Sequence, residues 1–126
     1  MASIFGFRTR SADRDGATDA GRLARMKALI AQVATEIDAE STGLEKRCRS
    51  EATDAGFLVE AIDNDEVSAQ SEARVEDLTS SLLRGERRLA TLSRQLALVN
   101  DLLALLRRFA DDDSAADQRL HQRGQA

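Results

Sequence analysis

The sequence contains no proline, tryptophan or tyrosine, and only four of its 126 residues are phenylalanine. Proline interrupts helices and aromatic residues are enriched in strands, so their scarcity favours long, uninterrupted helices. The remainder is rich in alanine, leucine and arginine, which are strong helix formers. We therefore predict an all-α protein of one domain's length.

Cysteine and histidine occur once each, as Cys48 and His121. A single cysteine forms no intrachain disulfide, and a zinc site needs several cysteine or histidine ligands, so we expect neither. No Glu-x-x-His pair is present to hold a di-iron centre, and the seven glycines are too scattered for a phosphate-binding loop. We expect no metal, no cofactor and no enzymatic activity, and we interpret His121 as an ordinary polar residue.

Two carboxylate pairs lie one helical turn apart, a spacing that paired general acids would also have. They are Glu36 with Glu40 and Glu72 with Glu76. Because no histidine, tyrosine or buried lysine accompanies them, we interpret them as solvated helix faces.

The net charge of -4 provides no overall basic field that would attract nucleic acid. Six arginines nevertheless concentrate in the second half of the chain: Arg84, Arg87, Arg88, Arg94, Arg107 and Arg108. They scatter over several faces of a helix, and no aromatic residue lies between them for base stacking. We interpret them as solvated or dimer-pairing side chains, with a nucleic-acid or membrane-surface role as an alternative.

The sequence has no long hydrophobic run. Its most apolar window, Leu96 to Leu106, contains Asn100 and Asp101 and is about half of the ~20 residues that span a bilayer. The apolar cluster at the N-terminus is too short for a signal peptide. We predict a cytoplasmic protein, and the excess of arginine over lysine indicates a GC-rich bacterial genome.

Apolar residues recur at alternating steps of three and four between Val75 and Ala110, which is the heptad pattern of a helix that packs along a narrow seam. The pattern is interrupted once, at Gly85. Its members are Val75, Leu78, Leu82, Leu89, Leu92, Leu96, Val99, Leu103 and Leu106.

A second seam begins after Thr18 or Asp19, either of which can cap a helix. Its members are Leu23, Met26, Ile30, Val33, Ile37 and Leu44, with Glu40 at one polar position. Beyond Leu44 the pattern shifts by four residues, as in a stutter, to Cys48, Ala52, Ala55, Leu58 or Val59, and Ile62.

The strongest turn signal is Asp63-Asn64-Asp65-Glu66. It predicts that two helices of similar length fold back on each other as an antiparallel, coiled-coil-like hairpin. The predicted segments are a flexible arm (1–17), the hairpin (18–110, with helices at about 19–62 and 66–110) and a disordered tail (111–126).

In an antiparallel pair, the numbers of facing residues add up to a constant. The pairs Leu23 with Leu103, Ile30 with Leu96, Ile37 with Leu89, and Leu44 with Leu82 each give 126, and Met26 with Val99 and Val33 with Leu92 give 125. We predict pairing within one chain in this register. It places Glu40 opposite Gly85.

Further apolar residues widen the seam near the turn and near the open end, and they form the candidate surface for a partner. They are Phe57, Ala61, Leu98, Leu102, Leu105 and Phe109. The N-terminal Ile4, Phe5 and Phe7 form a candidate docking arm or a shallow membrane anchor, although we expect them to cover the apolar stripe at the open end.

Residues around the turn are mainly acidic, and those at the open end are mainly basic. We therefore predict an antiparallel homodimer, a four-helix bundle in which each acidic turn packs on its partner's basic open end. These features predict a non-enzymatic protein–protein interaction module, such as a scaffold, adaptor or regulator. The alternative is a small chaperone or escort that binds an amphipathic helix of a client or secreted protein.

Overall fold

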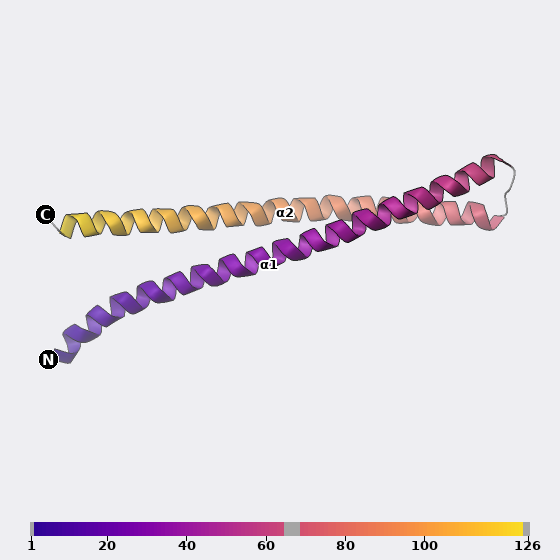
Figure 1. The fold of residues 1–126 in the computed structure, drawn as a ribbon. Helices are drawn as coiled ribbons and strands as arrows, with labels where there is room; N and C mark the ends of the chain where they lie inside the picture. Colours follow the sequence, from indigo (N-terminus) through magenta and orange to yellow (C-terminus); the bar gives the residue numbers. More distant parts are fainter. Residues whose placement is uncertain (1, 65–68, 125–126) are drawn as a thin grey trace. The chain divides into compact units, whose positions relative to one another are not determined.

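In a computed structural model, the chain forms two long α-helices joined by a turn (Figure 1). Helix α1 comprises Ala2–Asp63 and helix α2 comprises Ala69–Gly124. The structure describes residues 2–64 and 69–124, and only the backbone of residues 2–11. The two helices pack against each other, so the predicted all-α helical hairpin is confirmed.

Both helices extend beyond the predicted hairpin. Helix α1 begins at Ala2 rather than near Asp19, and α2 continues to Gly124 rather than ending near Ala110. Helix formation needs only backbone hydrogen bonds and favourable propensity, and no proline interrupts either end. Residues 12–20 and 116–124 are exposed throughout. At residues 12–20 and 116–124 the chain therefore differs from the hairpin in packing and not in backbone conformation.

Helix α1 ends at Asp63, within the predicted turn. The amide of Asn64 still donates to the carbonyl of Glu60, at 3.2 Å. Among the described residues, helix α2 begins at Ala69 and carries Glu72 in its first turn, where a negative charge stabilises the helix dipole. The proposed cap, Asp65, and the predicted start of the second helix, Glu66, lie outside the described residues.

The buried face of α2 follows one heptad pattern from the turn to Leu106. Along this face every third or fourth residue is buried or half-buried. These residues are Val75, Leu78, Leu82, Gly85, Leu89, Leu92, Leu96, Val99, Leu103 and Leu106. Leu92 is the most enclosed of them, with 1% of its surface exposed. Gly85 has no side chain, but it lies at a heptad position between Leu82 and Leu89 and is therefore buried with them.

The buried face of α1 also follows a regular pattern. From Ile37 to Ile62 the steps alternate between four and three without a stutter, because Ser41 and Glu51 occupy seam positions. The predicted shift at Leu44 is therefore wrong. An analysis of apolar spacing passes over Ser41 and Glu51 because their side chains are polar. The half-buried or buried members are Leu23, Lys27, Ile30, Ala34, Ile37, Ser41, Leu44, Cys48, Glu51, Ala55, Leu58 and Ile62.

Of two other predicted seam residues of α1, Met26 is exposed and Val33 is half-buried. Met26 is 45% exposed, whereas its neighbour Lys27 is half-buried. Val33 is half-buried, as is Ala34 beside it. The aliphatic stem of a lysine can line a seam while its ammonium group remains in water, so Lys27 is compatible with this position.

The chain divides into two compact units, and each contains a segment of both helices. One unit is Thr35–Leu98, which includes the turn. The other combines Met1–Ala34 with Val99–Ala126. The contacts that define the helix register lie in the first unit, and most of the exposed apolar side chains of the candidate surface lie in the second.

Candidate interaction surfaces

The register of the hairpin is defined by contacts in the unit Thr35–Leu98. The hydroxyl of Ser81 donates to Oε1 of Glu51 at 3.0 Å, and the numbers 51 and 81 add up to 132. Leu44 and Cys48 are the side chains nearest to the position that a Cβ atom on Gly85 would occupy. The numbers 48 and 85 add up to 133.

The predicted register, with a sum of 126, is wrong in this unit. Gly85 faces Cys48 and Leu44 instead of Glu40. The difference of seven is one heptad, and a slip of one heptad leaves the same kinds of seam position facing each other. The turn selects among these registers, because the helix ends, Asp63 and Ala69, have numbers that add up to 132. A sum of 126 would require the chain to reverse at residue 63, which is still helical.

Gly85 is buried where the sulfur of Cys48 enters the seam. An ideal Cβ atom on Gly85 would lie 2.5 Å from Sγ of Cys48 and 3.7 Å from Cδ1 of Leu44. Real side chains do not approach this closely, so glycine leaves the space that the thiol fills. At the interruption of the heptad pattern, the missing side chain of Gly85 on α2 is thus replaced by the sulfur atom of Cys48 on α1.

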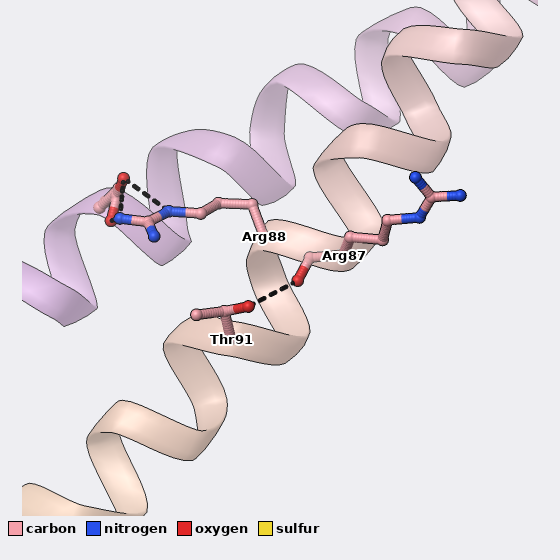
Figure 2. A network of polar contacts seen from close by, with 4 residues as sticks. Arg87, Arg88 and Thr91 are labelled. Atoms are coloured by element: carbon pink, nitrogen blue, oxygen red, sulfur yellow. Dashed lines mark hydrogen bonds and ion pairs between the residues drawn. The ribbon is translucent and has the colours of Figure 1, made fainter.

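Glu40 lies beside the seam and pairs with Arg88 across the two helices (Figure 2). Arg88 donates from Nε at 3.2 Å and from Nη2 at 3.0 Å to Oε1 of Glu40, and Nη2 also lies 3.0 Å from Oε2. The two side chains are about half exposed, so the pair contributes about 0–1 kcal/mol. Arg87 extends away from this pair, and its carbonyl accepts a bond from the hydroxyl of Thr91 at 3.1 Å (Figure 2).

A shallow hollow of about 250 Å³ lies over this part of the seam. Its lining includes Cys48, Arg47, Arg84 and Arg88. The pattern in the sequence identified Arg84 and Arg88, but Arg47 was missed because it lies on the other helix. No histidine lies among the lining residues, so Cys48 has no adjacent imidazole to act as a base.

The stripe near the open end is exposed. We call Leu98, Leu102, Leu105 and Phe109 the α2 stripe. Leu98, Leu105 and Phe109 are each more than half exposed, and Leu102 is 39% exposed. In contrast to the adjacent seam residues, these side chains are not covered by the helix partner within the described chain.

The other predicted contact residues are distributed less evenly. Phe57 near the turn is 67% exposed, whereas Ala61 is half-buried. On α1, Met26 and Leu29 are exposed, and the latter was not predicted as a surface residue. Its exposure follows from its position one residue before the seam residue Ile30.

The candidate docking arm continues α1, because its backbone is helical from Ala2 onwards. A continuous helix does not turn back along itself, so the arm is not folded back on α1. The expectation that it covers the α2 stripe stays a prediction. The side chains of Ile4, Phe5 and Phe7 lie outside the described residues.

The acidic pairs remain on exposed faces, with Glu36, Glu40, Glu72 and Glu76 all at the surface. Among residues 2–64 and 69–124, no group of three or more His, Cys, Asp or Glu side chains is placed to hold a metal ion. Within the same part of the chain, α2 is long and apolar enough to cross a membrane, by length and composition only. Of this apolar window, 11% is buried within the structure.

Comparison of the chain with protein-family models, curated proteins and solved structures gave no match.

Proposed function

We propose that this chain is a non-enzymatic interaction module whose two-helix scaffold presents the α2 stripe to another protein. The observation that supports the proposal is the exposure of four large apolar side chains, 39–59%, on one face of a helix whose other face is packed. Exposed apolar surface that a chain does not cover itself marks protein–protein or membrane contact sites.

Helical geometry makes the α2 stripe a continuous surface. Its members follow one another at steps of four, three and four, so they lie along one side of α2 next to the seam residues Leu103 and Leu106. An amphipathic helix that lies along such a stripe buries its own apolar face, as in helix-in-groove recognition and in four-helix bundles. The protein therefore acts as a scaffold, adaptor or regulator that assembles helical bundles in the cytoplasm.

A chaperone role for the same surface is the second candidate. It is favoured by the breadth of the apolar area, to which Met26 and Leu29 of α1 also contribute exposed side chains. A client helix would occupy the stripe transiently, whereas a structural partner would occupy it permanently.

Co-purification from native cell extract tests the interaction function. The full chain is compared with a stripe variant, Leu102→Asp/Leu105→Asp, and a matched control, Ala97→Asp/Ala104→Asp, whose substitutions are on exposed positions of α2 outside the stripe. We expect the wild type and the control to retain a stoichiometric protein partner, either a second copy or another chain, which the stripe variant loses. Recovery of the same partners by all three chains would contradict the stripe's role. Recovery of no partner by the wild type would contradict the interaction function itself.

A further inference from the structure

We infer that the partner of the α2 stripe is the α2 stripe of a second copy, lying antiparallel to the first. This inference rests on the proposed interaction function and specifies its partner. The spacing of the stripe supports it, because the steps of four, three and four read the same in both directions. In an antiparallel pair, Leu102 therefore faces Leu105 of the second copy while Leu98 faces its Phe109. Side chains that repeat at this spacing on both helices interdigitate along the contact.

The charges along the edge of the stripe select this orientation. Asp101 and Arg108 are exposed and lie three residues after Leu98 and Leu105, so both lie at the same edge of the stripe, one heptad apart. In the antiparallel pair each Asp101 lies beside the Arg108 of the other copy, which gives two attractive pairs. In a parallel pair Asp101 would face Asp101 and Arg108 would face Arg108, which gives two repulsive ones. Charge complementarity of this kind determines orientation more than affinity.

Helix α1 also exposes large apolar side chains. Glu40 on α1 directly precedes the seam residue Ser41, and Arg88 on α2 directly precedes the seam residue Leu89. Because Glu40 and Arg88 form an ion pair, these two positions lie along the same edge of the hairpin. Two heptads further from the turn, these positions are occupied by Met26 and Leu102. Both are exposed and belong to the same compact unit. Met26 therefore adds an exposed apolar side chain of α1 to the compact unit that contains Leu102.

The size of the surface suits a dimer. Leu29, Met26 and the α2 stripe are six large apolar side chains that are each 39–61% exposed, and the largest apolar patch on a typical monomer is about 300–600 Å². A standard stable interface buries about 800 Å² on each partner, so the surface would form the apolar centre of such an interface. The acidic region around the turn is a weaker partner for it, since Ala61 is half-buried there and Phe57 stands among charged residues.

Charge exchange in the purified full chain tests this arrangement. The variants are Asp101→Arg, Arg108→Asp and the double exchange, and the dimer dissociation constant is measured by sedimentation equilibrium. We expect each single variant to dimerise about tenfold more weakly, because two attractive pairs become repulsive. The double exchange is expected to restore the wild-type constant. A mixture of the two single variants is expected to form heterodimers in preference to either homodimer. Circular dichroism checks that the helices are intact, as both substituted positions are exposed.

Arg87→Asp is the matched control. It makes the same chemical change as Arg108→Asp, at the same heptad position three repeats earlier. Arg87 is exposed there and extends away from the Glu40–Arg88 pair (Figure 2), so its replacement should not alter the dimer. The antiparallel pairing would be overturned if the single exchanges left the dimer dissociation constant unchanged, or if the two single variants formed no heterodimer. Either result would leave the interaction function standing. A wild-type chain that stays monomeric at high concentration would overturn self-pairing. The native-extract experiment would then show whether the stripe binds a different protein.

Discussion

The sulfur of Cys48 occupies the space that a side chain on Gly85 would need. An ideal Cβ on Gly85 would lie 2.5 Å from that sulfur, inside the distance that non-bonded side-chain atoms normally keep. The two residues lie at the same level of the seam on opposite helices. They consequently fix how closely the helices approach there and which residues of α1 face α2.

Gly85→Ala is expected to destabilise the protein although alanine favours helices by ~1 kcal/mol relative to glycine. The added methyl group would press on Sγ of Cys48, and overpacking of this kind costs about 1–3 kcal/mol. The double variant Cys48→Ala/Gly85→Ala removes the sulfur and should be more stable than Gly85→Ala. Urea denaturation of all four chains gives a double-mutant cycle, in which we expect a coupling energy of about 1–3 kcal/mol. Additive effects of the two substitutions would show that the contact does not constrain the helices.

Leu92→Ala should cost about 2–5 kcal/mol of unfolding free energy, since it creates a cavity at the most enclosed position of the seam. Leu83→Ala is the control. Leu83 lies on the same helix and is 49% exposed, so its truncation leaves no enclosed cavity and should change stability little. Thermal unfolding followed by circular dichroism compares the two variants. Equal melting temperatures would mean that Leu92 is not enclosed in solution.

The register is testable by disulfide cross-linking in a Cys48→Ala background. Leu44→Cys/Leu89→Cys introduces thiols at positions whose numbers add up to 133, and Leu44→Cys/Leu82→Cys introduces them at positions that add up to 126. Disulfides form only when the two Cα atoms lie within about 7 Å. We expect rapid intrachain oxidation in the first variant and little in the second, as measured by mobility on non-reducing gels. The opposite result would restore the register that the sequence pattern predicted.

Removal of residues 1–17 should leave the melting temperature of the hairpin unchanged. Residues 12–17 of α1 are exposed throughout, so their deletion removes helix without removing seam contacts. The total circular dichroism signal at 222 nm should fall roughly in proportion to the helical residues lost. A substantial drop in melting temperature would show that the N-terminal segment packs on the protein. Deletion of residues 25–34, which removes the seam residue Ile30, is the destabilising comparison.

Much of the fold follows from the sequence alone. The 3–4 spacing from Val75 to Leu106 identifies most of the residues of α2 that are buried or half-buried, because this spacing keeps side chains on one face of a helix. The same spacing beside the seam identifies the α2 stripe, from Leu98 to Phe109, as a second apolar line along the helix. The turn near Asn64 is signalled by residues that tolerate turn geometry.

Helix ends and the weaker seam were less predictable. Ser41, Glu51 and Lys27 are half-buried in the seam, but a search for apolar residues does not find them because their side chains are polar. Their place in the heptad, and not their hydrophobicity, puts them under the neighbouring helix. Likewise, an apolar period reports where a helix packs and not where it begins. The helical segments before Thr18 and after Ala110 therefore escape a search for such a period.

The sequence by itself determined that two helices pack along a heptad seam, since the pattern of side chains requires one buried face on each. Only the tertiary structure decided the register. Heptads are equivalent to within seven residues, so several alignments of Leu44 satisfy the pattern equally well. The choice is made by the position of the turn and by the fit of Cys48 against Gly85, because chain connectivity and steric exclusion act between residues that the repeat alone does not bring together.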